Sequence, residues 1–162
     1  MIKLTELLTT PEHIRQGVVF SSKKRLFESI AAFIVSELSC DKGEQACFEC
    51  LFNREKLGNS GLGNGIAMPK GKLPKGIDKP IAIFMQLDSP IDYDAADGKP
   101  VDLVFALLIP GEQCSQYIPV LSSVSEKLTD KNLIKQLRAA QSAAEIWQIF
   151  QATDSIESIK ET

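Results

Sequence analysis

The chain has 162 residues, 44% of them hydrophobic and 24% charged, and a formal net charge of -3. This slight acidity argues against a dedicated nucleic-acid binder, which needs an excess of Lys and Arg to neutralise phosphates. No apolar run approaches the ~20 residues of a membrane span, and the N-terminus lacks a leader pattern, so we expect a cytoplasmic protein. This length suits one core, and we expect one domain over residues 1–153 with a frayed tail over residues 154–162.

The first third of the chain predicts one strand and two helices. Residues 15–20 form a short segment that ends in apolar side chains, as a strand does. Ser21 and Ser22 can cap a following helix, whose apolar residues recur at helical spacing as far as Leu38. A second helix over residues 44–54 has its apolar residues on one face, and the glycines that follow end it.

The middle of the chain predicts two neighbouring strands. Residues 79–87 and 101–109 are apolar, β-branched runs, and the second is apolar on both faces, which suits a central strand covered by helices on both sides. Between them, Asp97 and Gly98 form the strongest hairpin signal in the chain. We therefore expect the two strands to be antiparallel neighbours.

Three helices are expected after the second of these strands. The first covers residues 113–128, and Thr129 and Asp130 can cap the next helix. Ser142 and Glu145 have the spacing of a capping box at the start of the last helix. Helices and strands that alternate in this way predict an α/β fold, namely a single-domain three-layer sandwich with a mixed β-sheet flanked by helices.

A glycine-rich stretch, GLGNGIAMPKGKL at residues 61–73, precedes the two apolar strands. Its glycines permit positive φ or close backbone approach, whereas Pro69 fixes φ immediately before Lys70. The spacing does not match a Walker loop, so the signal for a general phosphate cradle is weak. The stretch is therefore expected to hold a defined backbone shape around Lys70.

Residues 51–73, LFNREKLGNSGLGNGIAMPKGKL, closely resemble the active-site segment of the enzyme IIA (EIIA) proteins of the mannitol/fructose and nitrogen-related phosphotransferase systems, and the nitrogen type in particular. The resemblance continues through PVDLVFALLIP (100–110) and LRAAQSAAEIWQI (137–149), so it extends over almost the whole chain after residue 15. It implies a mannitol-type EIIA fold, a mixed sheet between layers of helices, and it implies no cofactor.

The same resemblance assigns roles to three positions of the site. In the family, the residue after the proline is a histidine that carries the phosphoryl group, and here that residue is Lys70. A second family histidine, near the start of the helix after the central strand, corresponds to Tyr117. Arg54, which in the family lies beside the phosphorylation site, is retained. His13 is the only histidine of the chain, lies outside both motifs, and is expected to be an exposed loop residue.

The change from histidine to lysine alters the chemistry of the site. Neutral imidazole offers a lone pair to phosphorus and then carries a labile phosphoryl group. A lysine with an ordinary pKa of about 10.4 is protonated at neutral pH and is a poor nucleophile. We therefore expect a regulatory protein that has lost phosphorylation at the usual site, is not an enzyme, and acts by protein contact.

Two alternatives remain open. In the first, the chain is an active phosphocarrier that uses Lys70 or another acceptor. In the second, a minor one, Lys70 is an engineered substitution in a working relay protein, which the matching change at Tyr117 argues against. Incubation with the upstream proteins of the phosphotransferase system, followed by measurement of the intact mass, distinguishes a protein that has lost phosphorylation from an active phosphocarrier.

An anion site and several partners are also expected. Arg54, Lys70 and Lys72 beside the amides of Gly63 and Gly65 are predicted to hold a free anion such as phosphate. The resemblance implies regulatory targets that include potassium transport and sensor-kinase components, and it implies a small phosphocarrier protein as a further partner.

Four cysteines, at positions 40, 47, 50 and 114, are expected to be reduced thiols, and no metal site is expected. Cys47 and Cys50 have the CxxC spacing of redox or zinc sites, but burial on an apolar helix face explains them better. The basic cluster of residues 23–25 is expected to be solvated or, as the alternative, to form a docking face for an acidic partner.

Overall fold

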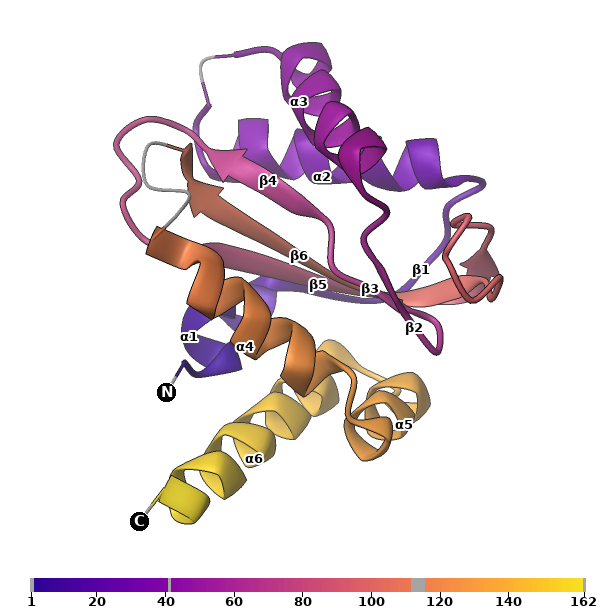
Figure 1. Ribbon diagram of the computed structural model, residues 1–162, viewed down its shortest axis with the longest axis vertical. Coiled ribbons are helices and arrows are strands. Elements are labelled where there is room, and N and C mark those ends of the chain that lie inside the picture. The colour runs from indigo at the N-terminus through magenta and orange to yellow at the C-terminus, as the bar shows by residue number, and fades with distance from the viewer. Residues whose placement is uncertain (1, 41, 112–115, 162) are drawn as a thin grey trace.

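One mixed β-sheet separates two layers of helices (Figure 1). The computed structural model describes residues 2–40, 42–111 and 116–161. The strands are β1 (Ile14–Val18), β2 (Gly61–Gly63), β3 (Ile66–Ala67), β4 (Lys70–Leu73), β5 (Ile81–Ile91) and β6 (Val101–Pro110). The helices are α1 (Leu4–Leu8), the short 3-10 helix η1 (Pro11–His13), α2 (Lys23–Glu37), α3 (Glu44–Leu57), α4 (Ile118–Leu128), α5 (Lys131–Ala139) and α6 (Ala143–Glu161).

The central strand β6 contributes to both hydrophobic cores. It pairs with β5 on one side and with β3 and β4 on the other. Phe105 and Leu107 belong to the core under α1, α4, α5 and α6, whereas Val104 and Ala106 belong to the core under α2 and α3 (Figure 1). Side chains alternate along a strand, so a strand apolar on both faces needs helices on both sides. The predicted central position of residues 101–109 and the fold class are both confirmed.

The antiparallel pairing of β5 with β6 is confirmed, with Phe84 opposite Phe105. The connection between them is longer than the expected tight turn, because it extends over residues 92–100. Gly98 still adopts a positive φ of 72°, which a glycine tolerates without strain. The two apolar runs therefore define the pairing, and the turn only permits it.

The predicted helix caps are present. Side-chain oxygens of Ser22, Asp130 and Ser142 accept bonds of 3.2, 2.9 and 3.1 Å from the backbone N–H groups of Arg25, Asn132 and Glu145. Each bond satisfies a donor that the first helical turn leaves without a backbone partner. The helix expected over residues 113–128 begins later, at Ile118, and residues 112–115, with Cys114, lie outside the described residues.

The frayed tail expected from residue 154 is wrong, because α6 continues to Glu161. Asp154 is buried and accepts hydrogen bonds from the backbone N–H groups of Leu4 and Thr5, at 2.9 and 3.0 Å, and from the Thr5 hydroxyl at 2.7 Å. This carboxylate satisfies the free N–H groups at the start of α1 and thereby joins α1 to α6. In the part of the chain that the structure describes, neither α6 nor another helix is long and apolar enough to cross a membrane.

The glycine-rich stretch contains three short strands. β2 and β3 form an antiparallel pair around Asn64, and β3 and β4 each run parallel to β6. Gly63 and Gly65 have φ values of 95° and 85°, which supports the expectation that glycines shape this segment. Lys70 is the first residue of β4 and lies opposite Leu107 of β6.

Candidate functional site

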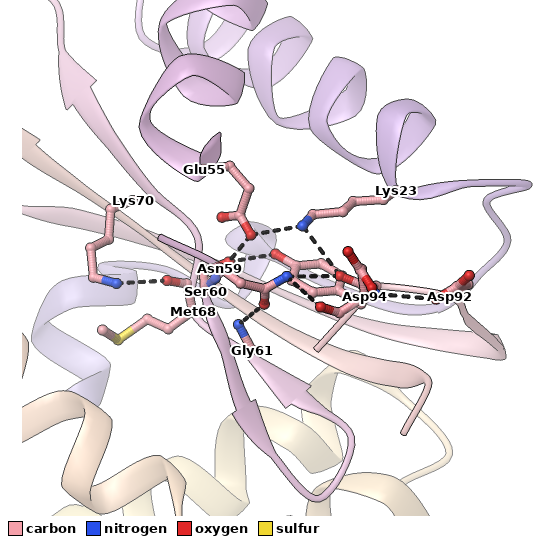
Figure 2. Close-up of polar contacts among 10 residues, drawn as sticks. Lys23, Glu55, Asn59, Ser60, Gly61, Met68, Lys70, Asp92 and Asp94 are labelled. Atoms are coloured by element: carbon pink, nitrogen blue, oxygen red, sulfur yellow. Dashed lines mark hydrogen bonds and ion pairs between the residues drawn. The ribbon is translucent and has the colours of Figure 1, made fainter. Parts of the chain in front are cut away.

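Lys70 is half-buried at the start of β4, the strand that forms one edge of the sheet beside β6 (Figure 1). Its Nζ lies 3.5 Å from the carbonyl oxygen of Met68, the contact drawn in Figure 2. Burial lowers the pKa of Lys70 below its ordinary value, the charge of Arg54 lowers it further, and the charge of Glu55 opposes this shift. Arg54 therefore lies near enough to Lys70 to act on it electrostatically.

The close packing of α3 on β4 explains how Arg54 comes near Lys70. A Cβ atom built on Gly71 lies 2.5 Å from Cδ2 of Leu51 and 2.9 Å from Cδ2 of Leu108, so only glycine fits there without movement. Leu51 belongs to α3, whose last turn carries Arg54 at the surface. The glycine at position 71 thus allows the helix to sit directly on the strand.

Glu55, next to Arg54 in sequence, is buried and makes two charge-assisted contacts (Figure 2). Its Oε2 accepts hydrogen bonds from Nζ of Lys23, at 2.8 Å, and from the backbone N–H of Ser60, at 2.9 Å. Lys23 belongs to α2, so this carboxylate joins the start of α2, the end of α3 and the segment that leads into β2. The expectation that the basic cluster is solvated is therefore wrong for Lys23.

Tyr93 completes this polar network. Its hydroxyl shares a 2.6 Å hydrogen bond with Oγ of Ser60, and its ring lies 4.1 Å from Nζ of Lys23. Burial, and then the charge of Glu55, raise the pKa of Tyr93 well above its ordinary value, so the phenol stays neutral. The carbonyl of Ser60 accepts from the N–H of Met68 at 2.9 Å. The contacts therefore run from α2 to the residue whose carbonyl faces Lys70.

Tyr117 lies at the N-cap position of α4 and is buried. Its hydroxyl donates a 3.2 Å hydrogen bond to the carbonyl of Asp78, in the connection before β5. The ring belongs to the same core as Met68 and Ile109. Tyr117 therefore lies on the α4 side of the sheet and ties the start of α4 to another segment.

The predicted anion cluster is only partly brought together. Asn64 N–H, between Gly63 and Gly65, already donates to the carboxylate of Asp97 at 3.0 Å. The Gly65 carbonyl accepts from Leu103 N–H at 3.1 Å, whereas Lys70 pairs with Leu107, about 13 Å further along β6. Including the two glycines in the cluster is therefore wrong, because they lie at the far end of the strand, beside the carboxylates of Asp97 and Asp102.

Lys72 lies close to Lys70 on β4. It is exposed, and its side-chain methylene groups lie beside Gly111 at the end of β6. Residues i and i+2 of a strand point to the same face, so the two lysines share one face of β4. Arg54 belongs to α3, which covers the other face of the sheet, so the structure places two cationic side chains, those of Lys70 and Lys72, on one face here.

His13 is not the exposed loop residue that we expected. It ends η1, its Nδ1–H donates to the Leu8 carbonyl at 2.8 Å, and its ring packs edge-on against Phe33 with centroids 5.0 Å apart. β5 and β6 lie between β1 and β4, which separates His13 from Lys70 by about 14 Å. His13 is therefore part of the packing and lies away from the site.

The CxxC cysteines do not form a paired site. Cys47 is buried and Cys50 is exposed, whereas Cys40 lies within 3.7 Å of Cys47, sulfur to sulfur. Among the described residues, no group of three or more His, Cys, Asp or Glu side chains is placed to hold a metal ion.

The comparisons with known proteins agree with this fold. The family described as "Phosphoenolpyruvate-dependent sugar phosphotransferase system, EIIA 2" matches residues 7–153, so the chain belongs to this family. The chain is 72% identical to a nitrogen regulatory protein homolog of Haemophilus influenzae over 158 residues, 97% of this chain and 96% of that relative. It is 43% identical to the nitrogen regulatory protein of Escherichia coli K12 over 143 residues, 88% and 86% of the two chains.

Solved structures show the same fold. The nitrogen regulatory protein IIA-Ntr of Neisseria meningitidis superposes with a TM-score of 0.79 at 37% identity, over 91% of this chain and 98% of that one. IIA mannitol of Escherichia coli has a TM-score of 0.69 at 20% identity, over 87% and 97%, and shows the fold alone. The resemblance to nitrogen-type EIIA proteins is confirmed, and with it a regulatory role of the phosphotransferase type.

Proposed function

We propose that this chain is a nitrogen-type EIIA regulatory protein that does not accept a phosphoryl group at the usual site and acts by protein contact. The observation that carries the proposal is Lys70, which stands after Pro69 where the resemblance places the phosphorylated histidine. Its ammonium group lies against the Met68 carbonyl, which can only accept a hydrogen bond and so favours the protonated form. A protonated nitrogen has no electron pair for phosphorus.

The second family position supports the same conclusion. Tyr117 is buried and donates to the Asp78 carbonyl, so its phenol serves the packing of α4. A phenol has no ring nitrogen with a lone pair, and its oxygen is a weaker base than imidazole. Neither position therefore offers the acid–base chemistry of a histidine pair.

One observation favours the alternative, an active phosphocarrier. Burial and Arg54 lower the pKa of Lys70, which raises the fraction of neutral amine above that of a solvated lysine. Even so, a phosphorylated lysine lacks the aromatic leaving group that makes onward transfer from imidazole easy. For Lys70, acceptance of a phosphoryl group is therefore the easier step and onward transfer is the harder one.

The partners are proposed from the resemblance. A site without phosphate presents Arg54, Lys70 and Lys72, which gives this surface positive charge, opposite in sign to a phosphohistidine. We expect regulatory targets in the cytoplasm, such as potassium transport or sensor-kinase components, to bind the protein in its unphosphorylated state. A small phosphocarrier protein can still dock there without transferring its phosphoryl group.

Phosphorylation by the relay tests the central claim. The protein is incubated with phosphoenolpyruvate, the first enzyme of the relay and its phosphocarrier, and intact masses are measured. The phosphocarrier gains a phosphoryl group, which shows that the relay works, and this chain gains none. An added phosphoryl mass that disappears in Lys70→Ala overturns the proposal.

A gain-of-function experiment tests whether these two positions account for the loss. We expect Lys70→His together with Tyr117→His to accept a phosphoryl group, while Tyr117→His alone remains inert. Circular dichroism confirms that each variant is folded. A folded double variant that stays unmodified refutes the view that these positions alone abolish transfer, and it places further losses in other parts of the site or in the docking surface for the phosphocarrier.

We also propose that Arg54, Lys70 and Lys72 bind a free anion such as phosphate. Charge-assisted hydrogen bonds contribute about 1.5–3 kcal/mol each, so Lys70→Ala is expected to weaken phosphate binding ~10- to 100-fold in titration calorimetry. Lys24→Ala, at an exposed position of α2, is the control and leaves the affinity unchanged. Absence of binding to the unaltered protein contradicts this site.

A further inference from the structure

The connection between α2 and α3 brings together two cysteines that the sequence spacing does not pair. Sγ of Cys40 lies 3.7 Å from Sγ of Cys47, although the CxxC motif suggests Cys47 with Cys50. Cys47 and Cys50 both belong to α3, and Cys40 follows the end of α2. We propose that Cys40 and Cys47 form a reversible disulfide on exposure to a hydroperoxide, which links the end of α2 to the start of α3.

The geometry needs only a small movement of one partner. A disulfide requires a sulfur–sulfur distance of about 2.05 Å, so the present contact must shorten by about 1.7 Å. Cys47 is held in the first turn of α3, where its N–H bonds to the Gly43 carbonyl at 3.2 Å. Cys40 lies outside both helices and follows Ser39, which has a positive φ of 53°. Cys40 can therefore approach without the loss of a helical hydrogen bond.

The two thiols differ in a way that defines the order of events. Cys40 is half-buried and Cys47 is buried. Burial, and then the hydrogen bond with Cys40, raise the pKa of Cys47 to about 11, so Cys47 is a thiol at neutral pH and does not react first. The more accessible Cys40 therefore meets the oxidant.

The reaction balances with a hydroperoxide as oxidant. The Cys40 sulfur attacks one oxygen of hydrogen peroxide, an S–O bond forms, the O–O bond breaks, and hydroxide leaves as water with the Cys40 proton, which forms a sulfenic acid. Sulfur of Cys47 then attacks Sγ of Cys40, the S–O bond breaks, and hydroxide departs as water with the Cys47 proton. The thiols lose two electrons and two protons in total, and the peroxide becomes two waters. A dithiol reductant reverses the bond by exchange.

Peptide mapping of the full chain tests this pairing. The reduced protein is treated with an equimolar amount of hydrogen peroxide, remaining thiols are alkylated, and the chain is cleaved after Lys42 and Glu49. Cys40, Cys47 and Cys50 then lie on three different peptides. We expect a linked Cys40–Cys47 peptide, an intact mass lower by two hydrogen atoms before alkylation, and loss of the link after dithiothreitol.

Single substitutions provide the controls. Cys50→Ser and Cys114→Ser are expected to keep the linked peptide, and Cys40→Ser is expected to remove it. The peptide map of the unaltered protein tests the proposed disulfide even if a substitution at Cys47 impairs folding. The proposal is overturned if Cys40 and Cys47 both stay alkylated, both carry added oxygen, or pair with Cys50 or Cys114 instead.

Discussion

Glu55→Gln removes one charge from the ion pair that joins α2 to α3, while the shape of the side chain is kept. The side chains of Glu55 and Lys23 expose only 6% and 18% of their surface, and their charged atoms are 2.8 Å apart. After the substitution, the Lys23 ammonium keeps a 3.3 Å contact with the Tyr93 carbonyl and a 4.1 Å contact with the Tyr93 ring. The ammonium is then largely buried without a counter-charge.

The size of the effect follows from this burial. Loss of one partner of a fully buried pair costs about 3–5 kcal/mol, and loss of an exposed pair costs about 0–1 kcal/mol. Lys23 retains some solvent contact and a cation–π interaction of about 0.5–2 kcal/mol. We therefore expect Glu55→Gln to lower the free energy of unfolding by about 2–4 kcal/mol, which a typical domain survives at 25 °C.

Urea unfolding measures this loss against a matched control. Glu28 pairs with Arg25 at 3.0 Å on the same helix, but the arginine and glutamate side chains are 66% and 37% exposed. Glu28→Gln is therefore expected to cost less than ~0.5 kcal/mol. Lys23→Met combined with Glu55→Gln should cost less than the sum of the single changes, because no unpaired charge then remains.

The reasoning is refuted if Glu55→Gln and Glu28→Gln have the same effect, or if the losses at Lys23 and Glu55 simply add. Either result means that the buried pair makes no coupled contribution to stability.

Three further predictions concern the site strand and the chain ends. Because the folded-state pKa of Lys70 lies below its ordinary value of 10.5, the stability that this group contributes rises with pH between the two values. The raised pKa values of Cys47 and Tyr93 act in the opposite direction at alkaline pH, so Lys70→Met should make the slope of stability against pH in urea unfolding more negative than in the unaltered protein. Asp154→Asn should lower the free energy of unfolding by about 1–3 kcal/mol and speed hydrogen exchange at Thr5, because the buried donors of α1 lose acceptors. Gly71→Ala should cost about 1–3 kcal/mol, because the new methyl group meets Leu51 and overpacks the contact of α3 with β4.

Exposed positions supply the controls for these variants. Lys24→Met keeps the pH slope of stability of the unaltered protein, and Asp88→Asn leaves stability unchanged. Gly58→Ala is tolerated, because a Cβ there meets nothing within 4 Å and φ is not in the left-handed region. A variant that behaves like its control contradicts the contact assigned to it.

Local patterns in the sequence were sufficient to predict the main helices and strands. The caps at Ser22, Asp130 and Ser142 are formed between residues two or three apart, so short windows of sequence contain both partners. The two-faced apolar run of β6 likewise predicts cover on both sides. The three short strands of residues 61–73 were not predicted, because β3 and β4 exist only through pairing with β6.

Sequence patterns alone were enough to predict the fold class and the family, and to identify Lys70 as the residue at the position where the resemblance implies a histidine. Which side chains contact one another around the site depends on the tertiary structure. Glu55 reaches Lys23 across 32 residues and Ser60 meets Tyr93 across 33, whereas Gly63 and Gly65 are close to Lys70 in sequence and distant along β6. Periodicity and capping are local properties of the chain, but buried charge pairs and sulfur contacts depend on how helices pack, which no short window of sequence contains.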